Sequence, residues 1–198
     1  MERTGASQLV VATRAGALGV ALVWILASCN SSGPGSAPTT ATTVAASRFT
    51  TLINAGILLL RHDNASAATQ LFQQAIQADP RNPIGYYNLG VVDQTERDVG
   101  AALREYRLAV EADPRYVPAL YNEAVALSGT DRAQAISLYQ EVISLQPDSP
   151  TALLNLGLLD FGTGRRSQGK VLLRRAVKLE PSLESKIPAS IHAEVAAP

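Results

Sequence analysis

The chain has 198 residues, 46% of them hydrophobic, which suffices for one ordinary domain or one short repeat array. Its 17 Lys and Arg residues balance its 17 Asp and Glu residues, so the basic excess typical of nucleic-acid-binding proteins is missing. Cys29 is the single cysteine and there are two histidines, which excludes an intramolecular disulfide and a thiolate-rich metal site. We therefore expect no metal and no other cofactor.

Residues 1–28 have the pattern of a targeting segment. A polar stretch containing Arg3 and Arg14 precedes an uninterrupted run of apolar residues and glycine from Ala15 to Ala27. This run is too short for a membrane-spanning helix, which needs about 20 residues. It has the length of the hydrophobic region of a signal peptide.

The apolar run ends in Leu-Ala-Ser-Cys at residues 26–29, and this tetrapeptide resembles the lipobox of bacterial lipoproteins. The resemblance implies a signal peptide over residues 1–28, cleavage before Cys29 and lipid modification of that cysteine. The protein is then expected in the cell envelope, anchored in either the inner or the outer membrane. The alternative is an uncleaved membrane helix over about Leu9 to Ser28, which must bury Arg14 or let its guanidinium reach the interface.

Residues 29–46 are predicted to be the lipidated cysteine and a flexible linker. Residues 30–46 contain no charge and are rich in Ser, Thr, Pro, Gly and Ala, a composition typical of flexible tethers. Fully extended, such a segment spans about 60 Å at most. The folded part is therefore expected close to a membrane surface.

Three markers recur along the rest of the chain. Small residues follow apolar stretches at Gly56, Gly90, Ala124 and Gly157. A second set stands at Ala75, Ala109, Val142 and Ala176, and prolines stand at Pro80, Pro114, Pro147 and Pro181. The proline spacings are 34, 33 and 34 residues, and the missing residue falls between Ala124 and Ala135, where a turn between two helices is expected to absorb it.

This period and these residue types resemble the tetratricopeptide repeat (TPR) family. The resemblance covers residues 47–181 and divides them into repeats at 49–82, 83–116, 117–149 and 150–183. It implies an all-α fold, an α-solenoid of four helix-turn-helix repeats with about eight helices. One pair cannot bury its own apolar face, so neighbouring repeats must stack.

Helix signals in the residues agree with this reading. Leu71, Ala75 and Ala78 share one face at helical spacing. The prolines after each second helix prevent its continuation. Asn82-Pro83 and Ser149-Pro150 place a capping side chain before a proline suited to the first helical position, and Asp131 is predicted to cap another helix.

The C-terminal tail, residues 184–198, continues an apolar pattern that begins just before it. Leu183, Ile187, Ile191 and Val195 follow at four-residue spacing, interrupted by Pro188. The pattern predicts a short cap over the last repeat.

The resemblance also implies where a ligand binds, because curved stacks of helix pairs present their first helices on the concave side. Carried over residue by residue, the predicted positions are Ile53, Asn54, Ile57, Tyr87, Asn88, Val91, Tyr121, Asn122, Val125, Leu154, Asn155 and Leu158, with Leu60, Gln94, Ser128 and Phe161 beside them. Most of these are apolar or tyrosine, and an exposed stripe of that kind usually marks a binding site. Lys and Arg, which clamp acidic C-termini in one TPR subgroup, are absent apart from Arg61 at the rim. We therefore expect an apolar or amphipathic protein segment as ligand.

Two alternatives to this ligand site remain open. The asparagine that recurs in every repeat can pair with a peptide backbone, as similar asparagines in the family do, because its amide both donates and accepts. It can equally belong to the family pattern and bond locally or to water. The groove can also be filled by the chain's own tail or by a second copy.

Four residues depart from the family pattern. Asp93 and Asp160 stand where an aromatic residue usually packs, and a buried carboxylate needs a partner. The arginines of the adjoining second helices are candidates, while the alternative is that both aspartates are partly solvated. Glu123 replaces the usual leucine, and Gly169 weakens the last helix.

No catalytic set is apparent in the sequence, so we do not expect an enzyme. His62 ends a helix, and nothing couples His192 to a nucleophile. The expected function is that of a lipid-anchored adaptor or assembly factor that holds a protein segment and binds no nucleic acid. The alternative is a self-associating structural subunit, or a pilotin-like accessory subunit of a secretion or pilus machine.

Overall fold

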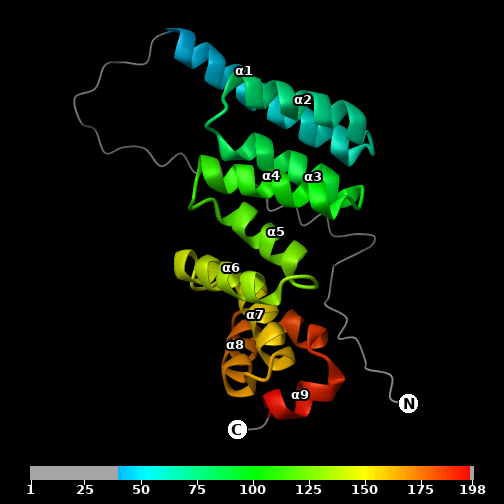
Figure 1. Cartoon of the computed structure of the whole chain (residues 1–198), viewed down its shortest axis with the longest axis vertical. Coiled ribbons are helices and arrows are strands. Elements are labelled where there is room, and N and C mark those ends of the chain that lie inside the picture. Colours follow the sequence, from blue (N-terminus) through cyan, green and yellow to red (C-terminus); the bar gives the residue numbers. More distant parts are fainter. Residues whose placement is uncertain (1–39, 197–198) are drawn as a thin grey trace, which may run out of the picture.

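The computed structural model describes residues 40–196, and every regular element in that part of the chain is a helix. Eight helices form four pairs stacked along the long axis of the molecule (Figure 1). They are α1 (Thr40–Arg61), α2 (Ala65–Ala78), α3 (Pro83–Thr95), α4 (Val99–Ala112), α5 (Val117–Leu127), α6 (Arg132–Leu145), α7 (Pro150–Gly162) and α8 (Arg166–Leu179). A 3-10 helix, η1 (Pro181–Lys186), and α9 (Ala189–Ala196) follow. The predicted all-α solenoid of helix pairs is confirmed, whereas the predictions for residues 1–39, Cys29 included, lie outside the described residues.

Glycines allow the two helices of a pair to approach closely. At Gly90 in α3, an added Cβ would come within 2.5 Å of the Tyr106 ring on α4. At Gly157 in α7, it would come within 2.8 Å of the Leu173 side chain on α8. Tyr106 and Leu173 are completely buried, so each large side chain fills the space that the glycine leaves.

The ends of the helices follow most of the predicted signals. The Asn82 side chain accepts a hydrogen bond from the Ile84 N–H at 3.2 Å, and Asp131 accepts one from the Gln134 N–H at 3.0 Å. The Ser149 cap was predicted wrongly, because its side chain makes no capping bond. There the start of α7 depends on Pro150, whose ring fixes a helical φ. Each second helix ends two residues before one of the recurring prolines.

The first helix begins earlier than the sequence predicted. The linker was expected to continue to residue 46, but α1 already begins at Thr40. The hydroxyls of Thr50 and Thr51 donate to the carbonyls of Ala46 and Ser47 one turn earlier. Both hydroxyls therefore have hydrogen-bond acceptors inside the helix. Alanines, the strongest helix formers, occupy much of the segment.

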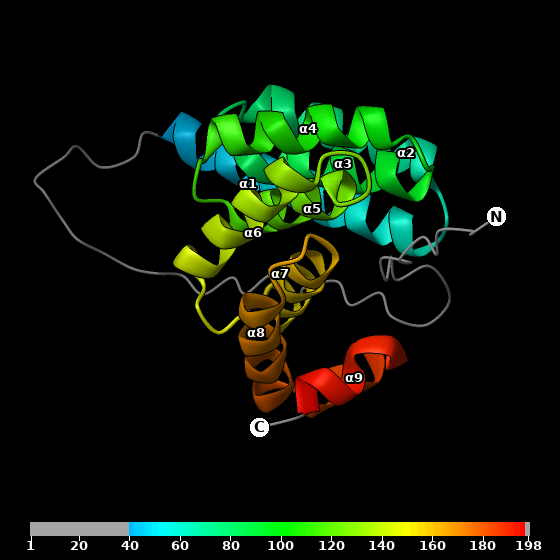
Figure 2. The same ribbon diagram turned by 60° about the horizontal axis from the view of Figure 1, so that its bottom comes forward.

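The helices form an inner and an outer layer. Figure 2 shows α3, α5 and α7 along the inner side of the stack and α4, α6 and α8 along the outer side. Three clusters of buried apolar side chains follow one another along the stack, centred on Phe72, Tyr139 and Leu173. Among the first helices, α1 contacts α3 directly, and α3, α5 and α7 each pack against the second helix of the preceding repeat.

The C-terminal end of the stack is closed by η1 and α9. Leu183, Ile187 and Val195 are 2%, 6% and 6% exposed and pack in one cluster with Leu173 of α8. The Arg174 guanidinium on α8 also donates to the Val195 carbonyl at 2.7 Å. These residues cover the face of α8 that a fifth repeat would otherwise bury.

Candidate protein-binding groove

One aliphatic side chain of each first helix stays partly exposed at the same position in the repeat. These are Ile57, Val91, Val125 and Leu158, which we call the aliphatic row. Their spacing of about one repeat places one on each of α1, α3, α5 and α7. The row therefore crosses the inner layer from the first repeat to the last.

The exposed apolar surface beside this row is smaller than the sequence predicted, because several of the predicted residues are buried. Ile53 and Leu154, four residues before members of the row, are only 6% and 3% exposed. The equivalent Tyr121 is half-buried, and its hydroxyl accepts a hydrogen bond from the Asn155 amide of the next repeat at 3.0 Å. Phe161 is also buried. This part of each first helix packs against its neighbours.

Three of the four recurring asparagines bond within the chain. Asn88 is buried and donates to the Ile84 carbonyl one turn earlier at 2.7 Å. Asn122 donates to the Tyr106 hydroxyl at 3.3 Å. Asn155 donates to two tyrosine hydroxyls, at 3.0 and 3.2 Å. The side-chain amides of these three asparagines therefore donate within the chain, as expected if they do not hold a ligand. Asn54 in the first repeat is exposed.

Tyrosine rings pack against one another within the second and third repeats, and asparagines of the following repeat donate to their hydroxyls. Tyr87 lies 6.1 Å from the ring of Tyr106 and 5.6 Å from that of Tyr116, and Tyr121 lies 5.8 Å from Tyr139 in an edge-on contact. Burial raises the pKa of each of these tyrosines, so their hydroxyls stay neutral at physiological pH. The sequence showed where the tyrosines recur but not that their hydroxyls join across repeats, because that depends on stacking.

The remaining polar positions of the predicted groove are also paired. The Tyr106 hydroxyl donates to the Gln94 side chain at 2.5 Å, and the buried Ser128 hydroxyl donates to the Ala124 carbonyl at 2.7 Å. Neither side chain offers a charge. The predicted groove positions therefore carry no charge, and their exposed surface comes from the aliphatic row and from Asn54.

The three acidic residues that depart from the TPR pattern differ in their burial and in their pairing with arginine. Glu123 is 4% exposed and pairs with Arg107 of the preceding repeat at 3.0 Å. Asp160 is 5% exposed and accepts two hydrogen bonds from Arg165, at the start of α8, at 2.8 and 2.6 Å. Asp93 is half-buried, and burial followed by the charges of Asp98 and Glu96 raises its pKa. These carboxylates lie at the packing surfaces between helices and lend no charge to the aliphatic row.

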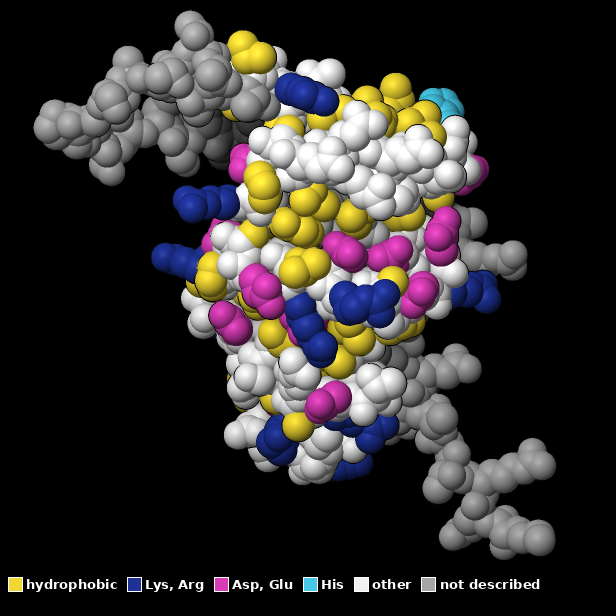
Figure 3. Space-filling view, turned by 45° about the horizontal axis from the view of Figure 1, so that its top comes forward, with side chains coloured by type: hydrophobic (Ala, Val, Ile, Leu, Met, Phe, Trp, Pro, Cys, Tyr) yellow, Lys and Arg dark blue, Asp and Glu magenta, His cyan; other side chains and the backbone are white. Residues whose placement is uncertain are grey.

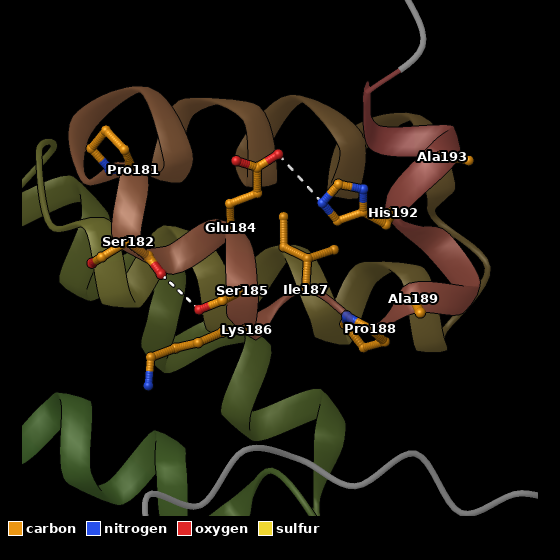
Figure 4. A pocket seen from close by; sticks show the side chains of 10 residues that line it. All are labelled: Pro181, Ser182, Glu184, Ser185, Lys186, Ile187, Pro188, Ala189, His192 and Ala193. Atoms are coloured by element: carbon orange, nitrogen blue, oxygen red, sulfur yellow. Dashed lines mark hydrogen bonds and ion pairs between the residues drawn. The ribbon is translucent and has the colours of Figure 1, made fainter.

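A surface hollow lies on the C-terminal cap (Figure 4). Its lining comes from η1, α9 and the turn between them, and the Glu184 carboxylate and His192 imidazole approach within 3.4 Å across it. Across residues 40–196, no three His, Cys, Asp or Glu side chains gather as metal ligands. No helix in that range is long and apolar enough to cross a membrane.

Family models described as tetratricopeptide repeat match residues 53–117 and 118–149. The repeat region of this chain belongs to the TPR family. The matched residues contain three members of the aliphatic row, Ile57, Val91 and Val125. No relative was found among the curated proteins.

Solved structures share the fold over most of the chain. PilF of Pseudomonas aeruginosa is 25% identical, with a TM-score of 0.67, and the match covers 76% of this chain and 71% of PilF. MamA is 21% identical, with a TM-score of 0.61 and coverage of 74% and 88%. The first TPR of Spaghetti (RPAP3), solved bound to an HSP90 peptide, is 19% identical, with a TM-score of 0.56 and coverage of 60% and 94%.

Proposed function

We propose that this TPR protein is a lipid-anchored adaptor or assembly factor of a bacterial cell envelope. Its ligand is an apolar or amphipathic protein segment that lies along the aliphatic row. The observation that carries this proposal is the partly exposed aliphatic side chain at one position in all four repeats. Ile57, Val125 and Leu158 pack with one side against the buried clusters and keep the rest of their surface open to a ligand.

The spacing of packed helices supports an estimate of the segment's length. Packed helices lie about 8–10 Å apart, so the row spans about 30 Å across the four first helices. An extended segment of about nine residues, or a helix of about 20, covers that length. The RPAP3 repeat holds an HSP90 peptide, which supports peptide binding by this fold. The uncharged groove here favours an uncharged segment over an acidic one.

Substitutions in the aliphatic row test the groove. Val91→Asp and Val125→Asp together place two carboxylates where an apolar ligand must bury them, which is costly without partners. We expect recovery of the bound protein, cross-linked to the full chain in cells, to fall at least ten-fold. Val171→Asp is the matched control, since Val171 is 65% exposed on the outer helix α8.

Unchanged recovery from the double variant, with a circular dichroism spectrum like that of the wild type, would refute binding along the row. Equal losses from the double variant and from Val171→Asp would also count against it, because only the former lies in the groove.

The lipid anchor has an independent test in globomycin, which blocks lipoprotein signal cleavage. We expect a larger precursor to accumulate in treated cells and to contain residues 1–28. A Cys29→Ser variant should give the same precursor without the drug. Absence of a precursor in both experiments would favour the uncleaved membrane helix.

A second candidate is an accessory subunit of a secretion or pilus machine. The likeness to PilF of Pseudomonas aeruginosa, at 25% identity, is the observation that favours it. This candidate predicts that the proteins cross-linked to the chain are components of one such machine. A diverse set of unrelated envelope proteins would favour the general adaptor.

A further inference from the structure

The two ends of the repeat stack are finished differently. The C-terminal end is covered by η1 and α9, whose outer surface carries exposed charged side chains such as Glu184, Lys186 and Glu194. At the other end, no described helix precedes α1. The face there is formed by half-buried residues of α1 and α2, which we call the N-terminal end face: Leu52, Ala55, Leu59, Ala67, Leu71 and Ala78.

The α1 residues of this face occupy positions that are buried in the third and fourth repeats, whereas Tyr86 and Asp93 at two of these positions in the second repeat are half-buried. In the third repeat the equivalent residues are Leu120, Glu123 and Leu127, exposed by 1%, 4% and 5%. The α4 helix of the preceding repeat covers them, through apolar contacts and the pairing of Arg107 with Glu123. The first repeat keeps apolar residues at all three positions with no described helix over them. A terminal repeat exposed to water would instead be expected to have a polar outer face.

The first repeat is also poor in charge. Arg48 and Arg61 are the charged residues of α1, and α2 has none, whereas the shorter α4 alone has four. The outer side of α2 exposes a stripe of glutamines at helical spacing, Gln70, Gln73, Gln74 and Gln77. In Figure 3, hydrophobic side chains lie along the upper edge of the molecule beside one Lys or Arg and one His side chain, and the band just below them is mostly uncharged. Depletion of charge is the compositional mark of interface cores.

We propose that the N-terminal end face binds the same face of a second copy of this chain, giving a two-fold symmetric dimer. The chemistry is self-complementary, because apolar side chains meet apolar side chains, and the glutamines on the adjoining outer side of α2 carry amides that both donate and accept. Arg48 is exposed one turn before Leu52 on the same side of α1, so it is the charged side chain of α1 that the two copies bring near this face. A head-to-tail contact is disfavoured, because the opposite end is closed by a charged cap and offers no apolar face. A self-complementary face of this kind produces a closed pair.

The size of the face makes the dimer reversible. Two neighbouring helices, each about 10 Å wide with a shared length of about 20 Å, present roughly 400 Å² per copy. That is about half of what a stable complex buries per partner. We therefore expect a dissociation constant in the micromolar range. A membrane anchor would compensate for this weak affinity by raising the local concentration of the copies.

Sedimentation equilibrium of the full chain, purified in density-matched detergent, tests the proposal. We expect twice the monomer mass at tens of micromolar, dissociating on dilution. Ala55→Glu or Ala67→Glu should raise the dissociation constant at least ten-fold, because each buries a carboxylate in the pair. Val171→Glu and Val125→Asp should leave it unchanged, which separates this dimer from the proposed groove.

A photo-reactive residue at position 55 of the full chain in cells identifies what covers the face. An adduct of twice the chain's mass, containing peptides of this chain alone, supports the dimer. An adduct with another protein overturns it. A monomer at every concentration, or a cross-link to the chain's own first 39 residues, overturns it too.

Discussion

Gly90 shows how closely one residue sets the spacing of a helix pair. A methyl group there would meet the Tyr106 ring, which is fully buried and held through its hydroxyl by Gln94. Overpacking of this kind costs about 1–3 kcal/mol, while the helix propensity of alanine returns about 1 kcal/mol.

We therefore predict that Gly90→Ala lowers the midpoint of thermal unfolding by several degrees, followed by circular dichroism. Gly129→Ala is the control, because an added Cβ there has no atom within 4 Å. A Gly90→Ala protein that melts at or above the wild-type temperature would show that the pair tolerates wider spacing.

The raised pKa of Asp93 makes the stability of the fold depend on pH. Its pKa is raised by burial and by nearby carboxylates, and the pKa of the neighbouring Glu105 is raised by burial and by Asp93. A carboxyl with a raised pKa holds its proton more tightly in the folded state than in the unfolded state. Stability therefore falls as pH rises through the carboxyl range, and the loss persists at neutral pH.

Asp93→Asn should consequently raise the unfolding midpoint at pH 7. The gain should shrink as pH falls toward the ordinary pKa of aspartate, where the wild-type carboxyl also becomes protonated. Melting curves of both proteins across this range give the measurement. A gain that does not change with pH would contradict the electrostatic cause.

Among the elements, α9 and η1 matter most for the end of the stack. Ile187 is 6% exposed and joins the cluster that contains Leu173 of α8. Ile187→Glu should detach the cap and raise amide hydrogen exchange in α7 and α8. Exchange in α1 and α2 should stay unchanged, because repeats contact only their neighbours. Leu179→Glu, at a side chain already 42% exposed, is the control. Faster exchange throughout the chain would mean that the stack unfolds as one unit.

The same elements show what the sequence could predict. Proline ends a helix and glycine permits close packing by their own covalent structure, so the helix pairs followed directly from Pro80, Gly90 and their equivalents. The asparagine bonds did not, because Asn122 and Asn155 donate to tyrosines 16 or more residues away. Ser149 and Asn82 both precede a proline at the start of a helix, yet of these two only Asn82 forms a side-chain cap. Local signals were therefore predictable, and contacts that depend on stacking were not.

At the scale of the whole molecule, stacking of the four repeats makes a feature that no single repeat contains. Each first helix contributes one partly exposed aliphatic side chain at the same position of its repeat, and these four side chains form the aliphatic row. The tyrosines and asparagines behind the row join successive repeats and leave it uncharged. A ligand that spans the row therefore contacts all four repeats at once.

A photo-cross-linking scan of the full chain in cells tests this claim most directly. The reactive residue is placed at Val91, at Val125 and, as control, at Leu108, which is 39% exposed on the outer helix α4. We predict that both groove positions give an adduct with the same second protein, mapping to one apolar or amphipathic segment, and that position 108 does not. Equal labelling from position 108, or groove adducts that contain only this chain, would contradict the groove as a site for a partner.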